Sequence, residues 1–177
     1  WVKENQSDEN VGKNAEKAKK NFAGTEIEGK KLGIVGLGKI GSRVAHLAQA
    51  FDMNVIACDP FVTREEMAAQ GVEKKDRLED LCAVSDYITV HTPLTDETRG
   101  MIGADQFARM KEGAVVINCA RGGIIDEAAA KTALESGRLA GLSVDVLANE
   151  LAGKGLGDNA GLESDLFGMK GFTVSPH

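Results

Sequence analysis

The sequence predicts an α/β fold in which a doubly wound parallel sheet is covered by helices on both faces. From residue 31 onward, short apolar segments alternate with segments of helical length, and this alternation is typical of a parallel sheet with right-handed crossovers. The first apolar segment runs directly into the glycine-rich stretch 36–41, GLGKIG, and the next one ends on Asp59. Because strand, glycine turn, helix, strand and acidic residue follow in this order, we expect a sheet of the Rossmann type.

The alternation predicts six strands and five helices. The strands are expected near residues 31–36, 54–58, 86–91, 113–118, 139–145 and 172–175, and the helices near 39–51, 64–70, 77–84, 104–110 and 126–136. The first strand contains the apolar run Leu32–Val35, which is typical of a strand buried on both faces. We expect the last helix to begin at Asp126 and Glu127, because acidic residues are favourable at the positive N-terminal end of a helix dipole.

The segment after the glycines is expected to be an amphipathic helix. Its apolar residues recur at helical spacing, at Ile40, Val44, Leu47, Ala48 and Phe51.

Each glycine of the turn has its own expected role. Gly36 allows a tight turn, Gly38 lets the backbone approach a pyrophosphate, and Gly41 lets the helix pack closely on the strand. The helix N-terminus then offers free N–H groups and a positive dipole end to the phosphates. The carboxylate of Asp59 can accept both hydroxyls of an adenosine ribose, so the whole pattern predicts a dinucleotide site.

Size and charge limit the classes of function. The 177 residues suffice for one domain with a sizeable core. A formal net charge of -6 and a pI of about 5.2 argue against nucleic-acid binding, which needs a basic surface. Lys17, Lys19 and Lys20 are expected to form a solvated helix face. No stretch has transmembrane length, so no membrane partner is expected, and no signal peptide precedes the charged residues after Trp1. That opening predicts a fragment or a trimmed chain.

The cysteines indicate a reducing compartment. Cys58, Cys82 and Cys119 are odd in number and form no CxxC pair. Neither a disulfide framework nor a zinc site is indicated, and no metal is expected. We expect small buried side chains in a cytoplasmic protein.

The ends of the chain differ in character from its middle. Residues 1–24 are polar and charged, and residues 14–22 could form a helix with little apolar face. We therefore expect an interdomain helix or linker stump at 1–24, which packs on a domain absent from the chain, and a dinucleotide-binding domain at 25–177. The glycine-rich stretch 152–171 is expected to be a long loop, and long loops are usually functional or mobile.

The carboxyl ends of parallel strands share one edge of the sheet, where open α/β sheets bind ligands. The segments expected at that edge are His91-Thr92-Pro93, Cys119 to Gly123, Asp145 with Glu150, and His177. An arginine (Arg121), a carboxylate and a histidine thus converge beside the dinucleotide site. Hydride exchange at a hydroxyl beside a carboxylate needs such a set: a fork that clamps the carboxylate, an acid/base that moves a proton, and an anion that tunes it.

Each of these residues also has an ordinary explanation. Arg121 could be a salt-bridged structural arginine, although its place between a strand and two glycines favours a ligand role. Glu150 alone is typical of a surface carboxylate, and His177 alone of a terminal residue without a role. His46 is expected on the polar side of its helix, in solvent. His91 ends a strand at the same edge, so position leaves both His91 and His177 open as the acid/base.

Four stretches resemble a known family. They are GKKLGIVGLGKIGSRVA from Gly29, SDYITVHTPLTDETRGMI from Ser85, MKEGAVVINCARGGIIDEAAA from Met110, and the final VSPH. Over nearly its whole length the chain resembles the D-isomer-specific 2-hydroxyacid dehydrogenases, and within them the phosphoglycerate dehydrogenases of serine biosynthesis. The resemblance implies NAD as the cofactor, a small 2-hydroxy or 2-keto acid such as 3-phosphoglycerate as the substrate, and a homodimer formed through this domain.

The resemblance also implies residue roles. Arg121 would bind the substrate carboxylate and carbonyl, His177 would be the acid/base and Glu150 its partner, which favours His177 over His91. Asp145 would hydrogen-bond the nicotinamide carboxamide. The other implied cofactor contacts are the backbone of Gly36, Gly38, Lys39, Ile40 and Gly41 at the pyrophosphate, Asp59 at the adenosine ribose, and Thr92, Pro93, Cys119 and Ala120 beside the following strands.

Three departures from the family pattern matter. Leu151 follows Glu150 where the family usually has proline, and the stretch 152–171 is longer and richer in glycine than usual. The substrate domain, which the family builds from both ends of its chain, is absent, so we expect the NAD-binding domain of an enzyme, inactive by itself. Two other functions stay open: a non-catalytic NAD-responsive binding protein of the corepressor type, and another enzyme of the same superfold, such as a formate dehydrogenase.

Overall fold

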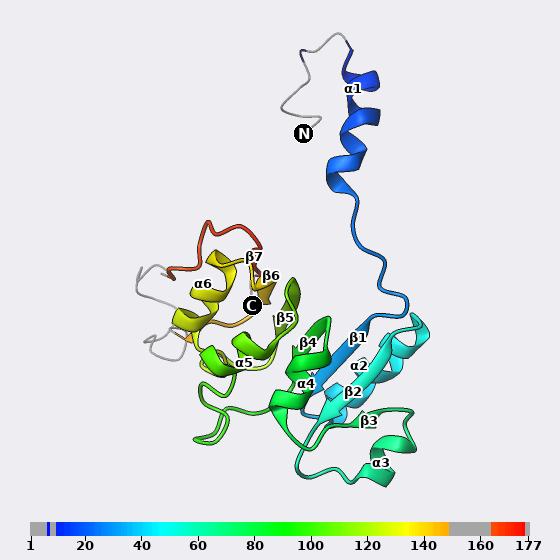
Figure 1. The fold of residues 1–177 in the computed structure, drawn as a ribbon, viewed down its shortest axis with the longest axis vertical. Helices are drawn as coiled ribbons and strands as arrows, with labels where there is room; N and C mark the ends of the chain where they lie inside the picture. Colours follow the sequence, from blue (N-terminus) through cyan, green and yellow to red (C-terminus); the bar gives the residue numbers. More distant parts are fainter. Residues whose placement is uncertain (1–6, 8–9, 149–163, 176–177) are drawn as a thin grey trace, which may run out of the picture.

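The computed structural model describes residues 7, 10–148 and 164–175 (Figure 1). Within these residues, seven strands form one sheet in the order β3-β2-β1-β4-β5-β6-β7, and every neighbouring pair is parallel. The strands are β1 (Lys31–Val35), β2 (Asn54–Cys58), β3 (Glu73–Lys74), β4 (Tyr87–Val90), β5 (Ala114–Asn118), β6 (Leu139–Val144) and β7 (Phe172–Val174). The expected doubly wound sheet of the Rossmann type is confirmed.

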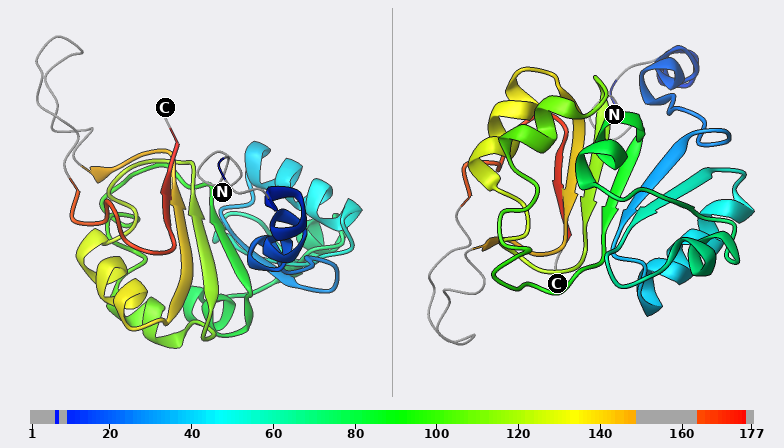
Figure 2. Two further views of the ribbon diagram at one scale, coloured as in Figure 1. Left: turned by 90° about the horizontal axis from the view of Figure 1, so that it is seen from above. Right: turned by 60° about the horizontal axis from the view of Figure 1, so that its bottom comes forward.

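Helices cover both faces of the sheet (Figure 2). The helices that pack on the sheet are α2 (Lys39–Ala50), α3 (Arg64–Ala68), α4 (Leu78–Val84), α5 (Ala104–Arg109) and α6 (Glu127–Glu135). They are preceded by α1 (Val11–Ala18), which continues as the 3-10 helix η1 (Lys19–Phe22). On one face, α4 packs against β1 at Gly33, where an added Cβ would lie 2.6 Å from Cδ2 of Leu81 in α4. On the opposite face, α2 packs Ala45 into one core with Leu32.

The hydrophobic core accordingly has two parts. The larger part joins α4, α5 and α6 to inward residues of the central strands, such as Val90 and Val116. The smaller part lies between α2 and strands β1 and β2, around Ala57. Ile34 and Val35 are consecutive in β1 yet belong to different parts, because a strand inside a doubly covered sheet is buried on both faces.

The expected strands and helices from residue 31 onward are present, and their ends differ from the predicted ones by at most two residues. The short strand β3 is an addition that the sequence pattern does not predict, since its two residues lie among charged neighbours and form no apolar run. The N-terminal helix begins at Val11 rather than at residue 14, and it projects away from the sheet (Figure 1). Of the long loop expected at 152–171, only residues 164–171 are described.

The apolar residues that the sequence places on one face of α2 are only partly buried. Three of its large apolar residues are 67%, 48% and 62% exposed, namely Ile40, Leu47 and Phe51. Its buried residues are small, namely Gly41, Ala45 and Ala48. The reason is the close approach of the helix to the sheet: a Cβ on Gly41 would lie 2.2 Å from Gly36 O. Only small side chains fit at this contact, so the larger ones lie on the flank of the helix.

The three cysteines have different environments. Cys82 is buried, and burial raises the pKa of its thiol to about 12. Cys58 is half-buried, and burial raises its pKa as well. Cys119 is exposed, which corrects the expectation that it is buried: the residue comes directly after β5, so its side chain emerges at the edge of the sheet instead of between the layers.

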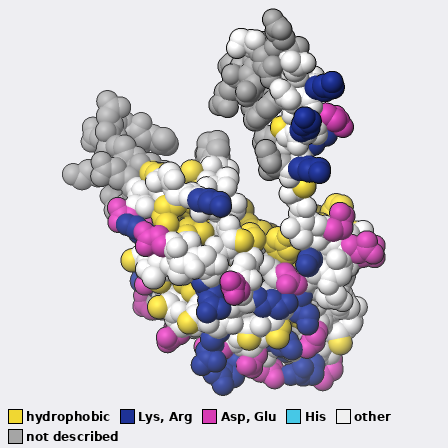
Figure 3. Space-filling model, turned by 45° about the horizontal axis from the view of Figure 1, so that its top comes forward, with side chains coloured by type: hydrophobic (Ala, Val, Ile, Leu, Met, Phe, Trp, Pro, Cys, Tyr) yellow, Lys and Arg dark blue, Asp and Glu magenta, His cyan; other side chains and the backbone are white. Residues whose placement is uncertain are grey.

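The surface carries charges of both signs. On the face drawn in Figure 3, basic and acidic side chains intermingle. The side chains of Lys17, Lys19 and Lys20 are exposed, as the sequence predicts for a solvated helix face. Among the helices in the described part of the chain, none combines the length and the apolar character needed to cross a bilayer.

Candidate functional site

The candidate site lies at the carboxyl edge of the sheet, next to β1. This strand lies between β2 and β4, and the chain leaves β1 through α2 on one face and leaves β4 toward α5 on the other. Doubly wound sheets bind ligands in the crevice that such a divergence creates. The two segments begin side by side there, since the His91 amide donates to Val35 O at 2.8 Å.

The glycine turn between β1 and α2 has little room for side chains. Gly36 has a φ of +91°, and a Cβ there would lie 2.9 Å from Thr92 Cγ2. Gly41 has no room either, because Gly36 O occupies the place of its Cβ. Gly38, the N-cap of α2, differs: no atom lies within 4 Å of its Cβ position, and the residue is exposed. The turn therefore presents open backbone, and the unpaired N–H groups of the first helical turn, to the solvent side of the crevice.

Thr92 supplies a polar atom at the same place. Its Oγ1 is the one buried side-chain N or O atom in the described residues that has no hydrogen-bond partner. Buried hydroxyls are nearly always hydrogen-bonded, and this one belongs to the residue whose methyl group faces Gly36. The glycine cradle and the orphaned hydroxyl together fit a polar ligand that approaches along the backbone, as a dinucleotide does.

Asp59 closes the other side of the glycine turn. It is 9% exposed, and its Oδ2 accepts a hydrogen bond from Leu37 N at 2.8 Å while its Oδ1 accepts one from Phe61 N at 2.8 Å. Each carboxylate oxygen has a further lone pair, so the group can still accept ribose hydroxyls. The two amide donors are contacts that the sequence pattern did not predict; their only signal was the position of Asp59 between a strand end and Pro60.

The cations nearest in sequence to Asp59 have partners of their own. Arg64 Nη2 pairs with Asp76 Oδ2 at 2.7 Å, and its Nη1 donates to Lys74 O at 3.3 Å. Lys74 Nζ donates to Val62 O at 2.5 Å. Arg64 and Lys74 are thus engaged with groups other than the Asp59 carboxylate.

Arg121 lies on the turn that follows β5, at the same edge. Its side chain is exposed, and its Nη1 donates to the neighbouring Ala120 O at 2.7 Å. Within the described residues no carboxylate pairs with its guanidinium, so the salt-bridged structural role is not observed there. Cys119 and Pro93 are also exposed at this edge, whereas Ala120 is half-buried.

Asp145 follows β6 and links two strand ends. Its amide donates to Asn118 O at 3.0 Å. Its Oδ1 accepts a hydrogen bond from Ser175 Oγ at 2.6 Å, which brings the end of β7 next to the end of β6. Glu150 and His177 lie outside the described residues, so the catalytic trio predicted from the sequence is described only at Arg121.

His91 is half-buried behind the end of β4. Its Nε2 lies 3.0 Å from Thr89 Oγ1, and burial lowers the pKa of its imidazole from the ordinary value of 6.5. A neutral ring tied to its own strand has one nitrogen left for a ligand. His46 is exposed on α2, as expected. Asp126 caps α6 by accepting from Ala129 N at 3.0 Å, so the predicted structural role of this residue is confirmed.

Metal binding finds no support in the described part of the chain. No cluster of three or more His, Cys, Asp or Glu side chains there could hold a metal ion.

Comparison with known proteins identifies the relatives of this chain. The sequence model described as D-isomer specific 2-hydroxyacid dehydrogenase, NAD binding domain, matches residues 2–177. The chain is 46% identical over 138 residues to the D-3-phosphoglycerate dehydrogenase of Methanocaldococcus jannaschii, and 51% identical over 125 residues to that of Bacillus subtilis. These alignments cover 78% and 71% of this chain but only 26% and 24% of the relatives. The chain therefore spans about a quarter of the length of these curated relatives.

Solved structures share the fold over nearly the whole chain. The holo form of Rhodotorula graminis D-mandelate dehydrogenase has a TM-score of 0.78 and 30% sequence identity, covering 96% of this chain and 47% of its own. The NAD-complexed D-isomer specific 2-hydroxyacid dehydrogenase of Lactobacillus delbrueckii ssp. bulgaricus has a TM-score of 0.76 and 33% identity, covering 88% of this chain and 49% of its own. A structural neighbour thus carries NAD on the same arrangement of strands and helices.

Proposed function

The chain belongs to the D-isomer specific 2-hydroxyacid dehydrogenases, as their NAD binding domain, and from this premise we propose that it serves an enzyme that exchanges hydride between NAD and a D-2-hydroxy acid, with 3-phosphoglycerate as the substrate. The names and identities of the curated relatives support this substrate. The single observation that carries the proposal is the Arg121 guanidinium, which has no carboxylate partner in the described residues and lies at the same sheet edge as the glycine turn.

The residues proposed to hold NAD follow the carboxyl edge of the sheet. The backbone of the turn and the first turn of α2 would bind the pyrophosphate, through Gly36, Gly38, Lys39, Ile40 and Gly41. Asp59 would accept the adenosine ribose hydroxyls, and Asp145 would bind the nicotinamide carboxamide. Thr92, Pro93, Cys119 and Ala120 would contact the cofactor between these ends. Bound NAD supplies the hydride acceptor.

The proposed chemistry needs three side chains of this chain. Arg121 grips the substrate carboxylate with two parallel N–H donors, a geometry that lysine cannot reproduce. In the oxidation direction, neutral His177 takes the proton of the 2-hydroxyl group as its general base. Anionic Glu150 stabilises the imidazolium that forms.

A binding titration and an assay test this function. We expect the chain to bind NAD saturably in calorimetry. It should give no rise in NADH absorbance with 3-phosphoglycerate, because it spans only about a quarter of the length of its curated relatives and the proposed function places the part that excludes water and positions the acid outside it. Residues 25–177, exchanged into the Bacillus subtilis relative in place of its own cofactor domain, should support oxidation of 3-phosphoglycerate but not of formate. A folded, NAD-binding chimera that oxidises no 2-hydroxy acid would instead favour the corepressor-type alternative, which no present observation supports.

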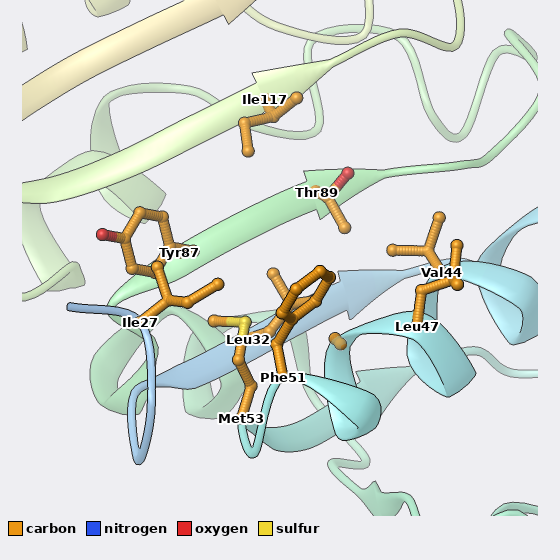
Figure 4. Close-up of a pocket in the computed structure, with 10 residues that line it drawn as sticks. Ile27, Leu32, Val44, Leu47, Phe51, Met53, Tyr87, Thr89 and Ile117 are labelled. Carbon is orange, nitrogen blue, oxygen red and sulfur yellow. The ribbon is translucent and has the colours of Figure 1, made fainter.

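A homodimer through this domain is part of the same proposal. A groove of about 270 Å³ lies beside α2, between this helix and the neighbouring sheet face (Figure 4). Its walls are almost wholly apolar and comprise Ile27, Leu32, Val44, Leu47, Ala48, Phe51, Met53, Tyr87, Thr89 and Ile117. Parallel sheets are ordinarily covered on both faces, and exposed apolar patches mark interfaces. We propose that a second copy of the chain covers this groove.

The proposed dimer is tested by measuring the molecular mass of the protein in solution. Phe51→Glu places a charge at the edge of the groove and should shift the protein from dimer to monomer in light scattering. Phe61 is 92% exposed and does not line the groove, so Phe61→Glu is the matched control and should remain dimeric. A wild-type chain that stays monomeric at high concentration would refute the dimer. The cytoplasmic location expected from the cysteines belongs to the same proposal, and imaging of the tagged protein in its cell checks it.

A further inference from the structure

Asn118, the last residue of β5, is a buried polar side chain that the proposed function does not yet use. It is 2% exposed and lies between Val90 of β4 and Val144 of β6 in the middle of the sheet. A carboxamide buried at such a place is costly unless its donor and acceptor are both satisfied. The partners of Asn118 therefore indicate what the residue is for.

Both hydrogen bonds of the carboxamide go to the turn that carries Arg121. Oδ1 accepts from Ala120 N at 3.0 Å, and Nδ2 donates to Arg121 O at 2.9 Å. The two partners determine which atom is oxygen and which is nitrogen, because an amide N–H only donates and a carbonyl only accepts. One buried side chain thus holds the backbone of two consecutive residues at the edge of the sheet.

The rest of the turn is held by backbone packing. A Cβ on Gly122 would lie 2.2 Å from Leu147 O, and Gly100 N donates to Gly123 O at 2.9 Å. These contacts seat the two glycines, but they do not reach Ala120 or Arg121. For the backbone of those two residues, the described side-chain hydrogen bonds are the two from Asn118 and one from Arg121 itself, whose Nη1 donates to Ala120 O at 2.7 Å. The Arg121 side chain is exposed, so Asn118 is the buried support of the turn.

We propose that Asn118 is a positioning residue: its carboxamide holds the turn of Cys119, Ala120 and Arg121 so that their contacts with cofactor and substrate form at fixed places. The proposal rests on the proposed function for the purpose of the turn, whereas the holding itself is a property of the chain alone. Aspartate cannot replace asparagine here. A carboxylate still accepts from Ala120 N, but it has no donor for Arg121 O and would face that carbonyl with a second oxygen.

Three variants of the 177-residue chain separate positioning from general stability. Asn118→Ala removes both hydrogen bonds, and Asn118→Asp keeps the size and the acceptor but removes the donor. Ser85→Ala is the control: Ser85 is 0% exposed and its Oγ donates to Leu81 O at 2.7 Å, but it lies before β4, at the opposite edge of the sheet. Amide hydrogen exchange and calorimetry with NAD and with ADP are measured for each variant, with thermal unfolding as the measure of stability.

The expected results differ between the variants. Asn118→Ala should speed exchange of the Ala120 amide by about tenfold or more, the consequence of losing a buried acceptor, while exchange in β1 changes little. Asn118→Asp should leave the Ala120 amide protected. Both variants should weaken the affinity for NAD several-fold. The affinity for ADP, which lacks the nicotinamide end, should stay within about twofold of wild type, because a displaced turn loses only the contacts that it makes itself. Ser85→Ala should lower the unfolding temperature without changing the affinity for NAD or ADP or the exchange rate of the Ala120 amide.

Each contrary result has a definite meaning. Unchanged exchange at Ala120 in Asn118→Ala would show that the turn holds itself, and it would overturn the proposal. Faster exchange with unchanged NAD affinity would overturn the link between the turn and the cofactor. Failure of the wild-type chain to bind NAD would refute the proposed function, while the exchange data would still decide whether Asn118 holds the turn.

Discussion

Leu37 N donates a hydrogen bond of 2.8 Å to Asp59 Oδ2, which joins the glycine turn after β1 directly to the end of β2. One carboxylate therefore shapes the turn, and in the proposed function the same carboxylate would accept the ribose hydroxyls. We therefore expect the same residue to influence the choice of cofactor, because its negative charge would repel the 2′-phosphate of NADP.

NAD should bind much more tightly than NADP. The carboxylate of Asp59 repels a 2′-phosphate, and the guanidinium of Arg64 is engaged with Asp76. Calorimetry with both cofactors checks this, and equal affinities would contradict it. Asp59→Ala should weaken NAD by about 1–3 kcal/mol, the cost of losing hydrogen bonds to a charged acceptor. The same variant should also unfold at a lower temperature, since the amides of Leu37 and Phe61 lose their acceptor.

Two glycine substitutions should separate folding from binding. Gly41→Ala forces a Cβ against Gly36 O, at 2.2 Å, and overpacking of this kind costs about 1–3 kcal/mol of unfolding free energy. Gly38→Ala meets no atom within 4 Å, so its stability should match wild type. The variant should nevertheless weaken the affinity for NAD about tenfold, because the added methyl group would lie between the backbone donors and the pyrophosphate. Thermal unfolding and calorimetry measure the two effects, and a Gly38→Ala variant with wild-type NAD affinity would remove the pyrophosphate from this turn.

Acid should destabilise the protein partly through His91. Burial lowers the pKa of this histidine in the folded state below its ordinary 6.5, so its contribution to stability is fully present above pH 6.5. As the pH falls from 6.5 toward the lowered folded pKa, the unfolded chain binds the proton first and stability declines. His91→Gln should flatten this part of the curve of unfolding temperature against pH. His46→Gln, at an exposed position, is the control and should leave the curve unchanged.

The acid/base should prove to be His177, with Glu150 as its anionic partner. In the chimera with the Bacillus subtilis relative, His177→Ala should reduce both reaction directions by roughly a hundredfold or more, the usual loss without a general acid/base. Glu150→Gln removes the charge and keeps the shape, so the imidazolium is less stable. The acid limb of the oxidation and the basic limb of the reduction should then both move to lower pH.

His91→Ala separates the two candidate histidines. It should leave these pH profiles in place and at most change cofactor affinity. If His91→Ala abolishes turnover while His177→Ala is mild, the acid/base lies after β4, and the roles inferred from the family do not apply to this chain.

The sequence alone was sufficient for the order and type of the described elements, with the exception of the short strand β3. Apolar run length, helical spacing and glycine position are local properties, and they predicted six strands, five helices and the conformation of Gly36 because each depends on a few neighbouring residues. The edge at which Thr92, Asp59 and Arg121 gather could also be predicted, since parallel strands place all their carboxyl ends together.

Only the tertiary structure decided which side of each element is buried and which atoms meet. Helical spacing could not reveal that Gly41, Ala45 and Ala48 form the contact of α2 while Phe51 lies on its flank, because the distance between helix and sheet determines which side chains fit. The same holds for Asn118. Its carboxamide bonds to Ala120 N and Arg121 O only because the folded turn brings these two backbone groups within hydrogen-bond distance. The neighbouring strands bury the same side chain, and this burial is also a result of the tertiary structure.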